Sequence, residues 1–296
     1  MHEPIVIHAH DHYVIGTCFA SKHPILVTSG MDKQIKLWSV PDWELIRTFE
    51  GHQNSVNSLS LNPEENLLAS GSTDASIRVW SFPSGELLHT LTDRKQTVAQ
   101  VKFSDSGRLL GGAYYGGYVA IWDKSGEPIF KAKASKKNLA SIDFHPNENL
   151  VALSGLGDEI LLWSIAEAKL VHKFFAHTVA VSGLRFTQSG KVLVSMGYDQ
   201  TVKFWNTETW EVNQLMSFDQ KPLRSLSFSH DEKVMAIALE GVIQLWSLSS
   251  WNLLEEFPAG AKALNQLSFS QDNQWLAAGA ADQKVRVWSL NLSDML

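Results

Sequence analysis

Residues 35–38 read IKLW, and tetrapeptides of the same kind, apolar at the first and third positions and closed by tryptophan, recur along the chain. The closing residues are Trp38, Trp80, Trp122, Trp163, Trp205, Trp246 and Trp288. Successive closing tryptophans are 42, 42, 41, 42, 41 and 42 residues apart. A period of about 20 to 50 residues indicates a repeat architecture. The chain is therefore predicted to contain seven copies of one structural unit.

Each repeat carries signals for short strands and none for an amphipathic helix. Apolar runs such as LLASG (67–71) and VALSG (151–155) alternate with turn-forming stretches such as NPEEN (62–66) and SDSGR (104–108). Each repeat accommodates four short strands in 40-odd residues, and the closing tetrapeptide belongs to the third of them. This pattern predicts an all-β fold, a seven-bladed β-propeller of four-stranded antiparallel blades.

The closing tetrapeptides, together with Gly51-His52, resemble those of the WD-repeat β-propellers, and the resemblance covers essentially the whole chain. One departure is that the residue after the closing tryptophan is Asp only at Asp123, and Ser or Asn elsewhere. The resemblance implies one propeller over residues 1–296. Too few residues follow Trp288 for an outer strand, so we expect residues of about 3–8 to complete the seventh blade and close the ring.

The stretch HAHDH (8–12) raises the alternative of a zinc site, but the repeat offers another explanation for its middle histidine. Three blades place His 28, a hydroxyl residue ten and Asp six residues before the closing tryptophan. The resemblance implies that these residues form a buried structural relay in which Asp accepts from His, His from the hydroxyl, and the hydroxyl from the indole N–H. The three predicted relays are His10, Thr28, Asp32, Trp38; His52, Ser70, Asp74, Trp80; and His177, Ser195, Asp199, Trp205. Blade seven keeps Asp282 but has Gly260 and Ala278 in place of the His and the hydroxyl. We therefore expect no metal site.

No nucleophile elbow, phosphate-binding loop, zinc-protease motif or dinucleotide fingerprint occurs in the sequence. We therefore predict a protein without catalytic residues and without a cofactor, serving as a platform for protein–protein interaction. Two alternatives stay open: an enzyme or small-molecule binder that uses the central channel, and a purely structural subunit of a larger assembly.

The predicted binding face is the end of the blades where the chain enters the first strand and where the second strand turns into the third. We expect its partner-binding residues to be Tyr13, Met31, Asn57, Arg94, Lys95, Tyr114, Tyr115, Lys136, Lys137, Tyr198, Arg224 and Asn265. In blades three and four, lysine and arginine neighbour tyrosines, which suggests a patch for an acidic or phosphorylated segment of a partner. The alternative is a solvated lysine-bearing rim.

Net charge is −6 with a pI near 6, and no run of about 20 apolar residues occurs, so we expect neither nucleic acid nor membrane as a partner. The N-terminal stretch lacks the basic and apolar regions of a signal peptide. Cys18 is the single cysteine, which is compatible with a reducing compartment. We expect a monomeric, cytoplasmic protein.

Three further tryptophans, Trp43, Trp210 and Trp251, each lie five residues after a closing tryptophan, in the turn between the third and fourth strands. We expect each of them to cap that turn by packing on its own blade. An exposed aromatic band for a second partner is the alternative.

Overall fold

The computed structural model describes residues 3–92, 95–218 and 223–292. These residues form 28 β-strands and one short 3₁₀ turn, η1 (Tyr115–Gly117). Within these ranges no helix has the length and apolar character needed to cross a membrane. The chain divides into two compact units, residues 1–59 with 221–296 (unit 1) and residues 60–220 (unit 2).

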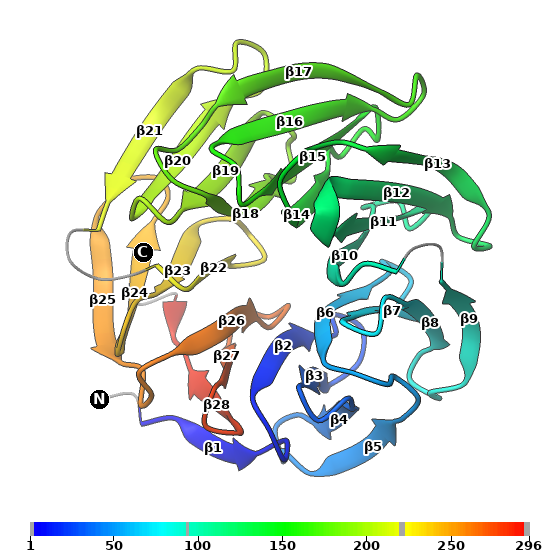
Figure 1. The fold of residues 1–296 in the computed structure, drawn as a ribbon. Coiled ribbons are helices and arrows are strands. Elements are labelled where there is room, and N and C mark those ends of the chain that lie inside the picture. The colour runs from blue at the N-terminus through cyan, green and yellow to red at the C-terminus, as the bar shows by residue number, and fades with distance from the viewer. Residues whose placement is uncertain (1–2, 93–94, 219–222, 293–296) are drawn as a thin grey trace. The chain divides into compact units, whose positions relative to one another are not determined.

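The strands form seven antiparallel sheets of four strands each, which we number as blades one to seven (Figure 1). Blades one, six and seven lie in unit 1. Blade one contains β2 (Val14–Phe19), β3 (Ile25–Gly30), β4 (Ile35–Ser39) and β5 (Leu45–Phe49), and blade six contains β22 (Ser225–Phe228), β23 (Val234–Ala238), β24 (Val242–Ser247) and β25 (Leu253–Pro258). Blade seven contains β26 (Leu264–Phe269), β27 (Trp275–Ala280), β28 (Lys284–Ser289) and β1 (Ile5–His8).

Blade two begins with β6, in which the boundary between the units falls, and blades three to five lie wholly in unit 2. Blade two contains β6 (Val56–Leu61), β7 (Leu67–Ser72), β8 (Ile77–Ser81) and β9 (Leu87–Leu91), and blade three contains β10 (Val98–Phe103), β11 (Leu109–Tyr114), β12 (Tyr118–Asp123) and β13 (Pro128–Lys133). Blade four contains β14 (Leu139–Phe144), β15 (Leu150–Gly155), β16 (Glu159–Ser164) and β17 (Lys169–Phe175), and blade five contains β18 (Val181–Phe186), β19 (Val192–Gly197), β20 (Thr201–Asn206) and β21 (Val212–Ser217). The predicted all-β fold of seven four-stranded blades is confirmed.

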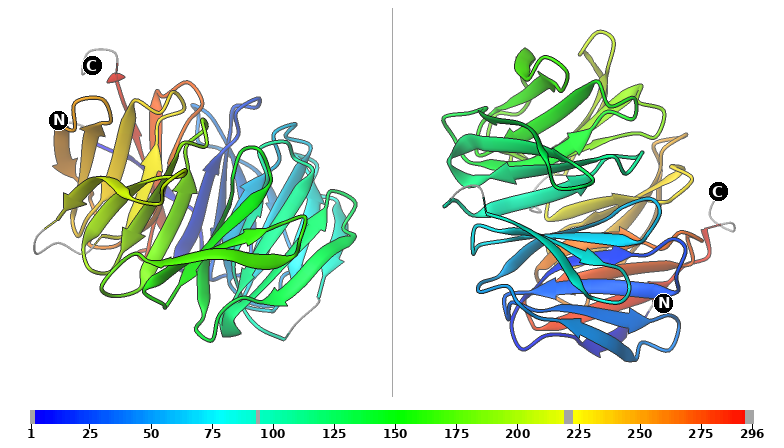
Figure 2. Two further views of the ribbon diagram at one scale, coloured as in Figure 1. Left: turned by 90° about the horizontal axis from the view of Figure 1, so that it is seen from above. Right: turned by 90° about the vertical axis from the view of Figure 1, so that its right-hand side faces the viewer.

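The N-terminal strand completes the last blade, as the sequence predicts. Strand β1 pairs antiparallel with β28, and Ile5 lies opposite Val287 while Ile7 lies opposite Val285. In unit 1 the last blade also contacts blade six through β22 and β26, and blade one through β2 and β26. The right-hand view of Figure 2 shows the red strands of blade seven beside the blue strands of blade one.

The hydrophobic cores lie at the junctions between consecutive blades. One core joins Ile121 of blade three to Ile142 and Trp163 of blade four, and equivalent cores join blades four to five, six to seven and seven to one. The second strand of each blade is buried over nearly its whole length. In blade four, which lies inside unit 2, the cores shared with blades three and five cover both faces of this strand. The fourth strand has one unpaired edge and is mostly exposed, as in β17. Closing tryptophans fill these junctions, which explains why the repeat requires a large apolar residue there.

Two of the three additional tryptophans contact the neighbouring blade, which corrects the prediction that they pack on their own blades alone. Trp43 of blade one meets Trp275 of blade seven edge-on, with ring centroids 5.2 Å apart. Trp210 of blade five packs on Phe174 and His172 of the outer strand of blade four, with ring centroids 5.7 and 6.0 Å away. The turn before the fourth strand projects toward the preceding blade, so a ring placed there reaches across the junction.

Candidate interaction face and its supporting relays

We call the loop that enters the first strand of a blade the leading loop, and the blade end that carries it the leading-loop end. Because the strands are antiparallel, the turn between the second and third strands lies at the same end. In blade one the leading loop contains residues 9–13 and the turn contains residues 31–34.

The relay residues of blade one are brought together beneath this end. Trp38 Nε1 donates to Thr28 Oγ1 at 3.0 Å, and Thr28 Oγ1 lies 2.8 Å from His10 Nε2. His10 Nδ1 lies 2.9 Å from both carboxylate oxygens of Asp32. An indole N–H can only donate, so the threonine hydrogen points to Nε2, and Nδ1 carries the proton that faces the carboxylate. Every polar side-chain atom of this relay, from the indole of Trp38 to the carboxylate of Asp32, therefore has a hydrogen-bond partner.

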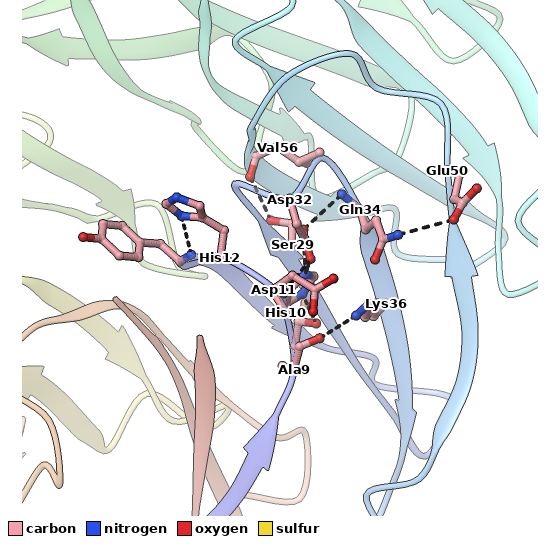
Figure 3. A network of polar contacts seen from close by, with 12 residues as sticks. Ala9, His10, Asp11, His12, Ser29, Asp32, Gln34, Lys36, Glu50 and Val56 are labelled. Atoms are coloured by element: carbon pink, nitrogen blue, oxygen red, sulfur yellow. Dashed lines mark hydrogen bonds and ion pairs between the residues drawn. The ribbon is translucent and has the colours of Figure 1, made fainter. Parts of the chain in front are cut away.

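The carboxylate of Asp32 also ties the leading loop to the turn (Figure 3). Its oxygens accept from the backbone N–H of Asp11 and of Gln34, both at 3.2 Å. Lys36 Nζ adds a bond of 2.8 Å to the carbonyl oxygen of Ala9. Burial raises the pKa of Asp32, but the hydrogen bond and charge of His10 and these backbone donors outweigh it, so the net pKa is lowered. The relay thus holds an ionised carboxylate that fixes two loops.

Blade five repeats the arrangement. Trp205 Nε1 donates to Ser195 Oγ at 2.8 Å, Ser195 Oγ lies 2.7 Å from His177 Nε2, and His177 Nδ1 lies 2.9 Å from Asp199 Oδ1. Burial raises the pKa of Asp199, but donors from Thr178, Thr201 and His177 lower it to about 2. Burial lowers the pKa of His177, against the opposing effect of Asp199, so the imidazole is neutral at pH 7.

In blade two, Trp80 Nε1 donates to Ser70 Oγ at 2.8 Å. Asp74 Oδ1 accepts from the backbone N–H and the hydroxyl of Ser76, at 2.9 and 2.5 Å. His52 is buried in unit 1. Its part in a relay stays a prediction.

Blade seven uses a different solution, which the sequence did not reveal. The guanidinium of Arg286 lies beside Gly260, the position that holds histidine in blades one, two and five, and makes two bonds to the carboxylate of Asp282, at 3.0 and 2.6 Å. The backbone of Gly260 has φ +66°, and a Cβ there would lie 2.9 Å from Arg286 Nε. The hydrogen bond and charge of Arg286 outweigh burial and lower the pKa of Asp282. Arg78 stands at the same position of blade two, which has His52, so an arginine two residues before the closing tryptophan does not by itself predict this replacement.

Some closing indoles have no hydroxyl acceptor. Trp288 Nε1 and Trp163 Nε1 are buried and have no hydrogen-bond partner among the described residues. Their equivalent hydroxyl positions are Ala278 and Leu153. In blade six Gln244 Oε1 accepts from Trp246 Nε1 at 3.0 Å.

At the leading-loop end, one position of the repeat projects large side chains into solvent. It lies seven residues before the closing tryptophan and holds Met31, Tyr115, Leu156 and Tyr198, with exposed fractions of 38%, 46%, 54% and 58%. In each of these blades the backbone N–H of this residue donates at 2.9 Å to a carbonyl oxygen at the start of the same blade, on Tyr13, Thr97, Asn138 or Ala180. The turn is thereby held against the leading loop, and its side chain points outward.

Most of the predicted partner-binding residues are exposed. The exposed ones are Tyr13, Met31, Lys95, Tyr115, Lys136, Lys137, Tyr198, Arg224 and Asn265. Asn265 uses its amide to donate to the carbonyl oxygen of Val14 at 2.6 Å, which ties blade seven to blade one. Arg94 lies outside the described residues.

Tyr114 does not fit the prediction of a partner-binding role, and the role of Asn57 stays a prediction. Tyr114 is fully buried at the end of β11, within the core shared by blades two and three. Side chains alternate along a strand, so Tyr114 points into the core where its neighbour Tyr115 points out. Asn57 lies within β6 and is half-buried.

Leu156 and Val179 were missed by the sequence analysis. They are 54% and 51% exposed, on blades four and five. The repeat phase contains the signal for Leu156, since it aligns with Met31, Tyr115 and Tyr198. Val179 lies 26 residues before its closing tryptophan. The preceding blades have polar or charged residues at this position (His12, Asn54, Gln96 and Lys137), so the apolar Val179 was the signal in the sequence.

The HAHDH stretch divides between three environments. His8 is exposed on β1, His10 is buried in the relay, and His12 is exposed in the leading loop, where its Nδ1 accepts from the backbone N–H of Tyr13 at 2.8 Å. Across the described residues, no three His, Cys, Asp or Glu side chains gather as ligands for a metal ion.

Comparison with known proteins places the chain in a family. The model of the IFT122 first β-propeller matches residues 13–289. Pre-mRNA-processing factor 19 of Bos taurus is 35% identical over 95 residues, which is 32% of this chain and 19% of that protein. Ribosome biogenesis protein ytm1 of Schizosaccharomyces pombe is 31% identical over 117 residues, 35% of this chain and 26% of that protein.

Pre-mRNA-processing factor 17 of Mus musculus is 23% identical over 192 residues, 64% of this chain and 25% of that protein. The chain thus spans about a fifth to a quarter of the length of these curated relatives. The family model covers nearly the whole chain and the seven blades agree with it, so this chain belongs to the family of the IFT122 first β-propeller and is a WD-repeat protein.

Proposed function

We propose that the protein is a non-catalytic platform for protein–protein interaction, which presents the leading-loop end of its blades to a partner protein or peptide. The observation that carries the proposal is the repeated position seven residues before the closing tryptophan. Four blades place a large apolar side chain there, at least 38% exposed, on a backbone fixed by a hydrogen bond. Exposed aromatic side chains on a rigid support are the residue types that dominate interface energetics.

The relays support this function mechanically. In blades one and five the aspartate fixes the leading loop and the turn relative to each other, through donors such as Asp11 and Thr178. Loops held in one conformation lose little conformational entropy when a partner binds. We further propose one propeller over residues 1–296 that acts as a monomer in the cytoplasm.

Quantitative affinity purification tests the platform. We expect tagged wild-type protein to recover specific partner proteins, and the double variant Tyr115→Ala, Tyr198→Ala to recover at least tenfold less of them. The matched control is Leu45→Ser, Leu87→Ser, which alters leucines of similar exposure (50% and 42%) on outer strands. Partners that bind all three proteins equally would contradict the proposed face.

The alternative function, a small-molecule binder or enzyme of the central channel, has its own readout. Thermal unfolding in the presence of a metabolite library would show stabilisation by a ligand in that case. The platform hypothesis predicts no metabolite-dependent shift of the melting temperature.

A further inference from the structure

Four exposed apolar side chains of unit 2 lie on neighbouring loops of blades three, four and five, and together we call them the blade 3–5 patch: Tyr115, Leu156, Val179 and Tyr198. Their exposed fractions are 46%, 54%, 51% and 58%. All four lie at the leading-loop end, three in the turns between second and third strands and Val179 in the leading loop of blade five.

A chain of hydrogen bonds shows that these segments are neighbours. Asn138 Oδ1 accepts from the backbone N–H of Gly116 at 2.8 Å, and its carbonyl oxygen accepts from Leu156 N–H at 2.9 Å. The next residue of the turn, Gly157, accepts from Val181 N–H at 3.0 Å. Tyr198 N–H then donates to Ala180, the residue after Val179, at 2.9 Å. The loops that carry the patch residues are therefore joined to one another from blade three to blade five.

The support of the patch is rigid because two glycines allow close backbone approach. A Cβ on Gly155 would lie 2.0 Å from the carbonyl oxygen of Asn138, and one on Gly117 would lie 1.9 Å from that of Ser135. Leading loops and turns are in direct contact at these points. The apolar side chains are thus preorganised on a fixed base, which lowers the entropic cost of binding.

Lysines border the patch. Lys136 and Lys137 directly precede Asn138, and Lys95 lies two residues before Thr97, which accepts from Tyr115 N–H. Lys137 has its Cδ 3.5 Å from the Cβ position of Gly157, and its Nζ lies 3.6 Å from Asp158 Oδ1. Lys95 and Lys136 are exposed, and neither forms an ion pair within the described ranges. These exposed cations stand out on a chain whose net charge is −6.

We propose that the blade 3–5 patch binds a peptide segment with one or two large apolar side chains flanked by carboxylates, and that phosphorylation is not required. The apolar side chains cover Leu156, Val179 and the two tyrosines, and the carboxylates face Lys136 and Lys137. Burial of the peptide's apolar side chains against the patch supplies the binding free energy, which a purely anionic segment could not gain there. The lysines then favour acidic over basic peptides. This inference rests on the proposed platform function and specifies the partner's chemistry.

The experiment is selection from a displayed library of random 16-residue peptides on the full chain, followed by anisotropy titrations of synthetic peptides. We expect the enriched peptides to combine Leu, Phe or Trp with Asp or Glu. Leu156→Ser and Val179→Ser should each weaken binding more than tenfold, and so should Lys136→Glu with Lys137→Glu. Leu87→Ser on outer strand β9 is the matched control and should bind like wild type. Phosphorylated versions of the same peptides should bind no more than threefold tighter.

The outcomes separate the two proposals. Enriched peptides that are basic, or that bind only when phosphorylated, yet still depend on Tyr115 and Tyr198 would overturn this inference and leave the platform intact. Peptides that bind every patch variant normally and lose affinity in Leu87→Ser would overturn both. Circular dichroism of each variant verifies that the altered chains are folded.

Discussion

At the residue scale, the hydroxyl of Thr28 joins the indole of Trp38 to the imidazole of His10, and through His10 it supports the leading loop of blade one. Thr28→Val leaves Trp38 Nε1 and His10 Nε2 without a protein partner in a buried site. We expect a loss of about 1–3 kcal/mol in the free energy of unfolding, measured by urea denaturation. Thr90→Val, on an exposed position of β9, should stay within about 0.5 kcal/mol of wild type. Equal effects of the two changes would mean that the relay contributes no stability.

The pair of Gly260 and Arg286 gives a second prediction at this scale. Gly260 and Gly241 both have positive φ, +66° and +81°, but only Gly260 has Arg286 at 2.9 Å from its Cβ position, whereas nothing lies within 4 Å of that of Gly241. Both Ala substitutions introduce the same kind of backbone strain, so their difference reports the crowding of the Arg286–Asp282 pair. We expect Gly260→Ala to lower the melting temperature clearly more than Gly241→Ala. The reverse order would contradict the proposed compensation in blade seven.

The ionised relay aspartate makes acid stability a third test. Asp199 has a pKa of about 2 in the folded protein against 3.8 in an unfolded chain, so its stabilisation is present above about pH 4 and is lost as the pH falls toward 2. His177, whose pKa is lowered, adds a loss of stability in the same direction below 6.5. By linkage, the lowered pKa of Asp199 stabilises the fold at neutral pH, and solvent screening of the partly exposed carboxylate reduces this contribution to about 1 kcal/mol. Asp199→Asn should therefore be less stable at pH 7 and should lose less stability than wild type between pH 4 and 2. An unaltered pH profile would contradict the relay's ionic character.

At the scale of elements, the period of the tryptophans predicted every blade, and five of the closing tryptophans (Trp38, Trp122, Trp163, Trp205 and Trp288) lie in the hydrophobic cores between blades. The seventh blade was predictable in the same way from the position of IVIH in the repeat phase. The sequence could not show which side chains contact a segment distant in sequence. Trp43 contacts Trp275 of the neighbouring blade, and Arg286 binds Asp282 in place of a histidine from the leading loop. Such contacts depend on the angles between blades, which a linear pattern does not contain.

Strand β1 provides the prediction at this scale. Deleting residues 1–8 removes the partner of β28 and Ile7 from the core shared with Val285 and Val287. We expect a melting temperature lower by many degrees and increased aggregation, because the edge of β28 is left unpaired. Val6→Ser, at a position 46% exposed, is the control and should melt near wild type. A truncated chain that melts like the full chain would refute the role of β1.

The candidate face was predictable in part. Tyr13, Tyr115 and Tyr198 were placed in exposed loops by strand phase alone, whereas Tyr114 differs from Tyr115 only by the alternation at the end of β11. A one-residue uncertainty in where a strand ends is enough to exchange a core residue for a surface residue. The blade 3–5 patch, in turn, depends on hydrogen bonds between loops distant in sequence, as from Tyr198 to Ala180 and from Val181 to Gly157.

At the scale of the whole molecule, seven similar blades share one strand pattern, and the relays of blades one and five fix the loops of those two blades. Identity of fold does not assign a partner, since function lies in the side chains placed on the loops. The curated relatives are matched over about a fifth to a quarter of their length, so the partner must be found with this chain itself.

The most direct test is hydrogen–deuterium exchange of the full chain with and without the partner recovered by affinity purification. We predict slower exchange at the leading-loop end of blades three to five, in residues 115–118, 135–139, 156–158, 177–181 and 198–200. Outer strands such as β9 and β17 should exchange as in the free protein. Protection confined to outer strands, with those loops unchanged, would contradict the claim that the leading-loop end is the interaction face.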